Sequence, residues 1–127
     1  MCHTIAIIDH DEAILDSARL VLAGEDWLTR LYTKGREFVA DLRSSVPPDC
    51  LVLDPHLPDM SGLEVAEHVA NTPLRIPIIV WTAQPHSFQV TEILHANVHV
   101  ILTKPVAAEP LIKEIRVAIR TNPRAPA

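Results

Sequence analysis

Four side chains that could carry chemistry stand at the ends of apolar segments of this chain: Asp9, Asp54, Thr82 and Lys104. Asp54 ends the run Cys50-Leu-Val-Leu-Asp54 and is followed by a turn that contains prolines. A lone carboxylate in such a place can bind a cation, act as a base or attack an electrophile. If the four side chains meet, two carboxylates, a hydroxyl and an ammonium form a set suited to phosphoryl chemistry.

The elements that would position these residues alternate along the chain. Apolar and β-branched runs predict five strands, at residues 4–9, 27–33, 50–54, 76–82 and 98–103. Stretches with helical periodicity predict five helices, at residues 12–23, 35–44, 61–71, 88–96 and 107–120. Such alternation requires right-handed crossovers and a parallel sheet covered by helices on both faces. Because the carboxyl ends of parallel strands share one edge, we expect all four side chains at that edge.

Length and composition bound the class of protein. A chain of 127 residues with 48% hydrophobic residues is predicted to form one globular domain, at residues 1–121, followed at 122–127 by a tail or the start of a linker. The formal charge of −5 argues against sequence-independent binding of nucleic acid or of an anionic membrane. Cys2 and Cys50 form no metal-binding spacing, and no signal peptide or membrane span is visible, so we expect a cytoplasmic chain.

The order of motifs carries a family resemblance. The segments are Ile7-Ile-Asp-His-Asp11, Asp54 with Leu57-Pro58 and Ser61-Gly62, Val80-Trp-Thr-Ala83, and Leu102-Thr-Lys-Pro105. Taken together, from about Thr4 to Arg120, the chain resembles the receiver domain of two-component response regulators. The resemblance implies an α/β, flavodoxin-like (βα)5 fold, a doubly wound parallel sheet with strand order 2-1-3-4-5, an order that comes from the family rather than from the residues.

The resemblance also implies a role for each site residue. Asp54 would be the phosphoacceptor, attacking the phosphohistidine of a sensor histidine kinase or of a phosphotransfer protein. Asp9, Asp54 and the backbone carbonyl of His56 would bind Mg²⁺, and the His56 ring is expected at the mouth of the site. Lys104 would hold a phosphoryl oxygen, and the hydroxyl of Thr82 would turn inward to bond the phosphate.

His10 departs from the family pattern, in which two adjacent acidic residues end the first strand. Imidazole suits zinc, copper or nickel better than magnesium, so Mg²⁺ binding should weaken. Three alternatives stay open. In the first, Asp9 with His10 or Asp11 as a further ligand binds enough Mg²⁺ for phosphorylation. In the second, the domain is a pseudo-receiver that is not phosphorylated and signals by docking. In the third, a transition metal is bound by Asp9, His10, Asp54 and His56.

A second departure is Ile101, where the family usually has an aromatic residue that moves with the switch threonine.

The resemblance implies a switch rather than an enzyme in the ordinary sense. Its partners would be the kinase or phosphotransfer protein and a downstream effector protein, or an output domain beyond Pro123 if the chain is truncated there. A homodimer is a further candidate, and no direct contact of this domain with nucleic acid or membrane is expected.

Overall fold

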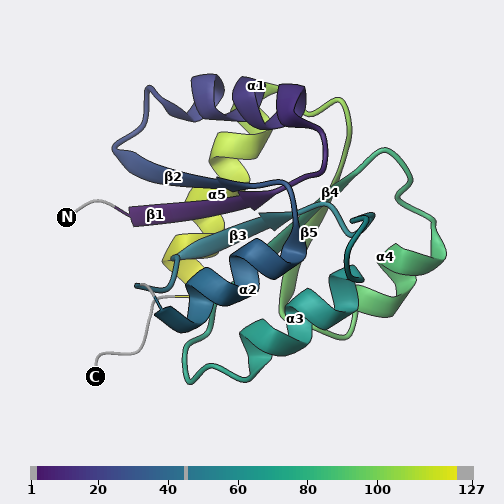
Figure 1. The fold of residues 1–127 in the computed structure, drawn as a ribbon. Coiled ribbons are helices and arrows are strands. Elements are labelled where there is room, and N and C mark those ends of the chain that lie inside the picture. The colour runs from purple at the N-terminus through teal and green to yellow at the C-terminus, as the bar shows by residue number, and fades with distance from the viewer. Residues whose placement is uncertain (1–2, 45, 123–127) are drawn as a thin grey trace.

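A parallel sheet of five strands organises the computed structural model, which describes residues 3–44 and 46–122 (Figure 1). The strands lie in the order β2-β1-β3-β4-β5, so the expected order 2-1-3-4-5 is confirmed. Their bounds are β1 His3–Ile8, β2 Trp27–Tyr32, β3 Cys50–Leu53, β4 Ile78–Thr82 and β5 Val98–Thr103. Cys2 and most of the expected tail at 122–127 lie outside the described residues.

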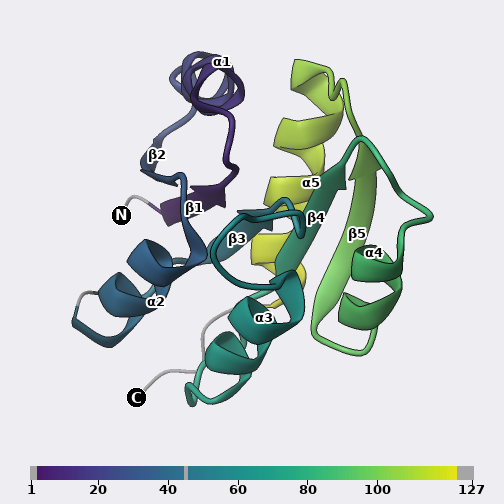
Figure 2. The ribbon, with the colours of Figure 1, turned by 45° about the vertical axis from the view of Figure 1, so that its right-hand side comes forward.

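Helices cover both faces of the sheet (Figures 1 and 2). They are α1 Glu12–Leu22, α2 Gly35–Ser44, α3 Gly62–Ala70, α4 Phe88–Ile93 and α5 Ala108–Thr121. One core cluster joins the sheet to α1 and α5, through residues such as Leu15 and Ile115. The second core cluster joins the other face to α2, α3 and α4, through residues such as Phe38, Val65 and Ile93. The predicted two-sided arrangement is therefore confirmed.

The burial of the central strands explains why their sequences are continuous apolar runs. Every residue of β3 and β4 is buried, and in β1 only His3 is exposed, because helices cover these strands on both faces. The edge strand β2 instead has mostly half-buried residues, as its charged Arg30 predicts. Cys50 lies in this core, and burial raises the pKa of its thiol, so the thiol is a buried, unreactive core group.

The expected bounds of one helix need correction. The sequence predicts a helix at 88–96, but α4 ends at Ile93, and Leu94 is its C-cap. The next residues form a turn, in which Ala96 N–H donates to the carbonyl of Ile93 and Val98 N–H donates to that of Ala96. Three β-branched residues, Val90, Thr91 and Ile93, lower the helix propensity of this segment, which accounts for the early end.

The loop after β3 is fixed at both of its ends. A capping box starts α3, with Ser61 accepting from Glu64 N–H and the Glu64 carboxylate accepting from Ser61 N–H. Gly62 lies so close to Pro55 that an added Cβ would stand 2.7 Å from the Pro55 Cβ and 2.8 Å from its Cα. Only glycine therefore permits this approach, which holds the loop against the residue that follows Asp54.

A membrane span is not found among residues 3–44 and 46–122, since none of their helices is both long and apolar enough to cross a bilayer.

Candidate functional site

The side chain of Lys104 joins the two strand-end carboxylates. Its Nζ donates to Asp9 Oδ2 and, at 2.7 Å, to Asp54 Oδ2. The Asp9 side chain is fully buried, that of Asp54 is 6% exposed, and that of Lys104 is 13% exposed. The predicted meeting of these three residues at one edge of the sheet is confirmed, although Asp9 and Lys104 are far apart in the sequence.

The charges at this site do not balance. Two carboxylates face one ammonium, so the three groups together leave a net negative charge at a largely buried site when all are ionised. Burial alone would lower the pKa of Lys104, but the hydrogen bonds and charges of Asp54 and Asp9 outweigh it and raise that pKa. The ammonium therefore stays charged at neutral pH, and the remaining negative charge favours a cation at the site.

Backbone amides orient the two carboxylates in the same way. Asp9 Oδ1 accepts from Asp11 N–H at 2.9 Å, and Asp54 Oδ1 accepts from His56 N–H at 2.9 Å. In each case the donor lies two residues further along the chain, which is the geometry of an Asx turn. Each carboxylate therefore presents its other oxygen, Oδ2, to Lys104.

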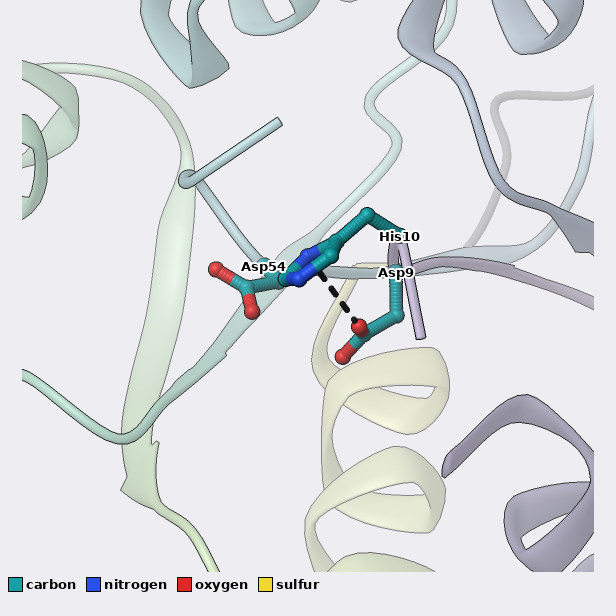
Figure 3. A group of neighbouring side chains, drawn as sticks. All are labelled: Asp9, His10 and Asp54. Atoms are coloured by element: carbon teal, nitrogen blue, oxygen red, sulfur yellow. Dashed lines mark ion pairs between the residues drawn. The ribbon is translucent and has the colours of Figure 1, made fainter. Parts of the chain in front are cut away.

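His10 forms an ion pair with Asp9 when its ring is charged, and Figure 3 marks this pair with a dashed line. Its Nδ1 is 3.7 Å from Asp9 Oδ1, and its side chain is 57% exposed. Among the described residues, Asp9, His10 and Asp54 offer ligand atoms within 4.8 Å of one another and could hold a metal ion. The histidine that departs from the family pattern thus belongs to this group.

Asp11 serves another purpose. Its carboxylate is the N-cap of α1 and accepts from Ala13 N–H at 2.9 Å, and the residue is exposed. It is not one of the three residues that could share a metal ion. The interpretation of Asp11 as a further metal ligand is therefore not supported by its geometry, because its side chain already satisfies the first turn of a helix.

Thr82 is fully buried at the end of β4. Its Oγ1 accepts from Gln84 N–H at 2.9 Å and lies 3.4 Å from His56 Nδ1. The structure thus brings Thr82 to the site through His56, whereas Lys104 contacts Asp54 directly. The inward turn that the family resemblance implies for this hydroxyl stays a prediction.

The contacts of the His56 ring were missed by sequence reasoning. The ring was expected at the mouth of the site, and that position stays a prediction; the ring is 24% exposed. Its Nδ1 is 3.1 Å from Asp54 Oδ1, and its Nε2 is 3.0 Å from Ser87 Oγ. The only signal was the position of Ser87 before the expected fourth helix. The role of the His56 carbonyl as a metal ligand stays a prediction.

The ring of Trp81 forms the wall of the pocket beside Lys104. Lys104 Nζ lies 5.3 Å from its ring centroid, which is a cation–π distance. The indole is buried, and its Nε1 has no hydrogen-bond partner among the described residues. Trp81 is thus a core aromatic residue that also contacts the ammonium from a third side.

A further carboxylate, Asp59, supports the site from the loop after β3. It accepts from Gly35 N–H at 3.0 Å and from Arg36 N–H at 2.9 Å, and so satisfies the first turn of α2. Its small burial would raise the pKa of Asp59, but these backbone hydrogen bonds and the Arg36 charge lower it overall.

Replacing Asp59 with alanine should lower the free energy of unfolding by about 1 kcal/mol at neutral pH, the usual value of a helix cap. Because the folded state holds the pKa of Asp59 below its unfolded value of about 3.9, this contribution is present above that pH and is lost as the pH falls below it. Urea unfolding of both proteins at neutral and at acid pH measures the difference. Asp16→Ala, at a side chain that is 67% exposed, is the matched control. An equal difference at both pH values would contradict the capping role.

Comparison with known proteins gives one consistent result. Residues 5–116 match the family model of the response regulator receiver domain. The response regulator MprA of Mycolicibacterium vanbaalenii is 34% identical over 116 residues, which cover 91% of this chain and 50% of that protein. The MprA of Mycobacterium tuberculosis has the same identity and coverage. The chain therefore spans about half the length of the curated relatives it matches.

Solved structures agree on the fold. A CheY-like receiver domain protein from Methanospirillum hungatei has a TM-score of 0.87 at 24% identity, with 96% of this chain and 97% of that chain covered. The BeF3-activated DrrB receiver domain has a TM-score of 0.81 at 25% identity, over 94% and 99% of the two chains. The receiver domain of the sensor histidine kinase PA1611 from Pseudomonas aeruginosa, with magnesium coordinated in its active-site cleft, has a TM-score of 0.85 at 19% identity, over 94% and 99%.

Proposed function

Because this chain belongs to the receiver-domain family of response regulators in two-component signalling, we propose that it accepts a phosphoryl group on Asp54 and thereby switches its binding to a partner. One observation carries the proposal. Asp54 stands at the end of β3 with one oxygen on the Lys104 ammonium and the buried Asp9 carboxylate sharing that ammonium. This is a carboxylate nucleophile with its electrostatic partner already in place.

The reaction follows from these groups. A carboxylate oxygen of Asp54 attacks the phosphorus of a phosphohistidine on a histidine kinase or phosphotransfer protein. The bond from phosphorus to the donor's ring nitrogen breaks, the electron pair leaves with that nitrogen, and Asp54 becomes an acyl phosphate. The Lys104 ammonium, which lies 2.7 Å from Asp54 Oδ2, stabilises the charge on the transferred phosphoryl oxygens. The domain acts as a switch on proteins rather than as an enzyme with a small-molecule substrate.

The residues at the pocket fit a divalent cation. Asp9 and Asp54 supply hard oxygen donors and an excess of negative charge, which is what magnesium prefers. We assign the binding of Mg²⁺ to Asp9, Asp54 and the carbonyl of His56, and when bound the ion would neutralise developing phosphoryl charge. The receiver domain of PA1611 coordinates magnesium in its active-site cleft. A transition metal is the competing occupant, because the His10 imidazole belongs to the same group of ligand atoms.

The pseudo-receiver alternative has less support. It rests on His10 alone, whereas Asp9, Asp54 and Lys104 are joined as a phosphoryl site requires and Thr82 lies buried at the next strand end. The curated relatives are about twice as long as this chain, which supports an effector domain or effector protein as the downstream partner. A cytoplasmic location belongs to the same proposal. A homodimer remains a further proposed assembly.

Phosphorylation by acetyl phosphate in the presence of Mg²⁺ tests the function. The intact mass of the protein should rise by one phosphoryl group, and peptide mapping after reduction of the acyl phosphate should locate it at Asp54. Asp54→Asn should show no gain, because the amide is a poor nucleophile, and it is otherwise isosteric. If neither acetyl phosphate nor a phosphorylated phosphotransfer protein modifies the unsubstituted protein, the domain is a docking module instead.

A further inference from the structure

We propose that His56 is a positioning residue that links the state of Asp54 to the start of α4 through the hydroxyl of Ser87. The inference rests on the proposed phosphorylation of Asp54. Three contacts carry it: His56 Nδ1 to Asp54 Oδ1 at 3.1 Å, His56 Nε2 to Ser87 Oγ at 3.0 Å, and Ser87 Oγ to Val90 N at 3.3 Å. They form an unbroken chain of hydrogen bonds from the phosphoacceptor to the first turn of a helix.

The chemistry of the ring fixes the direction of these bonds. Asp54 Oδ1 is an acceptor when ionised, so the neutral ring carries its proton on Nδ1. Nε2 is then an acceptor, and the Ser87 hydroxyl donates to it. The same Ser87 oxygen accepts from Val90 N–H, so each atom of the chain has one consistent role. For a neutral ring, the hydrogen bonds therefore assign the Nδ1–H tautomer to His56.

The hydrogen bonds end at α4, a short helix that depends on its N-cap. α4 has only six residues, and a helix of that length depends on its cap and on packing. Ser87 is that cap, and Phe88 beside it is 68% exposed, whereas Val90 and Ile93 are buried in the core. A change in the partner of the Ser87 hydroxyl therefore acts on the cap of this short helix, at the bond to Val90 N–H.

Phosphorylation would change that partner. An acyl phosphate no longer has a free carboxylate, and its charge moves outward to the phosphoryl oxygens. The Asp54 oxygen that faces His56 then becomes a neutral and weaker acceptor, so the bond from the ring weakens or the ring turns to a phosphoryl oxygen. Either change alters the bond from Ser87 to Nε2. The usual aromatic switch residue is replaced by Ile101, a half-buried aliphatic side chain that has no polar atom. His56 thus supplies a polar route from the site to α4 that Ile101 cannot.

Two variants of His56 test the hydrogen bond to Ser87 while Asp9, Asp54 and Lys104 stay unchanged. His56→Phe keeps a ring but has no polar atom, and His56→Asn keeps a donor toward Asp54 but is too short to reach Ser87. Neither touches the Ser87 cap itself. Ser61→Ala is the matched control, because Ser61 caps α3 with the same geometry but has no histidine partner among its described contacts.

The experiment uses NMR of the isolated domain, free and with beryllofluoride and Mg²⁺, where beryllofluoride stands in for the phosphoryl group. In the unsubstituted protein, the His56 ring nitrogens should show the Nδ1–H tautomer. Amide exchange of Val90 should change by about fivefold to tenfold on adding beryllofluoride, the factor that one helix cap represents. In His56→Phe and His56→Asn this change should fall below about twofold, while Ser61→Ala should retain it.

The outcomes distinguish the two proposals. If the amides of Asp54 and Lys104 respond to beryllofluoride but Val90 responds equally in all variants, the link is wrong and the phosphoacceptor role stands. If no pocket amide responds in the unsubstituted protein, the phosphoacceptor role fails with it. The free protein then still tests the contact between His56 and Ser87. Either an Nε2–H tautomer of His56 or an unchanged amide exchange of Val90 in His56→Phe would show that the contact is wrong.

Discussion

Replacing Lys104 with methionine should lower the free energy of unfolding by about 3–5 kcal/mol at neutral pH, the usual cost of removing one partner from a buried ion pair. The side chain of Lys104 is 13% exposed, and its Nζ donates to both Asp9 and Asp54. Methionine preserves much of the packing but leaves two buried carboxylates facing each other without a counter-charge. The loss should therefore come from electrostatics, and urea unfolding monitored by circular dichroism measures it.

A second substitution tests that reason. The double variant Lys104→Met with Asp54→Asn has one carboxylate fewer, so it should recover a large part of the lost free energy. Millimolar Mg²⁺ should also stabilise Lys104→Met more than the unsubstituted protein, because the cation replaces the missing ammonium charge. If Lys104→Met unfolds at the same urea concentration as the unsubstituted protein, or if the double variant gains nothing, the pair does not hold the pocket together.

The fold was largely predictable because each strand and helix is marked by the hydrophobic pattern of its own residues. Continuous apolar runs in β3 and β4 indicate burial on both faces, and alternation with helices requires a parallel sheet. The convergence of Asp9, Asp54 and Lys104 then follows, because these residues end or follow parallel strands. The strand order was not predictable in this way, since the residues of each strand say little about its neighbours. It came from the family resemblance.

The side-chain contacts were not predictable from spacing. Asp11 could have been a metal ligand or a helix cap, and only the folded geometry shows that its Oδ1 accepts from Ala13 N–H as the cap of α1. The bond from His56 to Ser87 joins two loops that are 31 residues apart, and no periodic pattern marks it. The end of α4 at Ile93 depends on a turn whose residues resemble a weak helix. Sequence patterns report burial and local backbone preference, whereas polar contacts between loops depend on the folded geometry.

His10 is the residue at which sequence and structure together give the sharpest expectation. Changing it to aspartate should tighten the dissociation constant for Mg²⁺ by about tenfold or more. The substitution adds a hard oxygen ligand and one negative charge beside Asp9 and Asp54. A tenfold change needs only about 1.4 kcal/mol, and two unit charges 4 Å apart interact by about 4 kcal/mol near a protein surface, so the effect survives the screening expected at a 57% exposed side chain.

Titration with Mg²⁺, followed by tryptophan fluorescence, measures the constant, since Trp81 lies against the Lys104 ammonium. His10→Asn separates the two causes, because it offers an oxygen ligand without the charge and should tighten binding less. The preference for Zn²⁺ or Ni²⁺ over Mg²⁺ should fall in His10→Asp, because the imidazole that favours those metals is gone. Equal Mg²⁺ constants for the unsubstituted protein and His10→Asp would place His10 outside the metal site, and its departure from the family pattern would then carry no weight for phosphorylation.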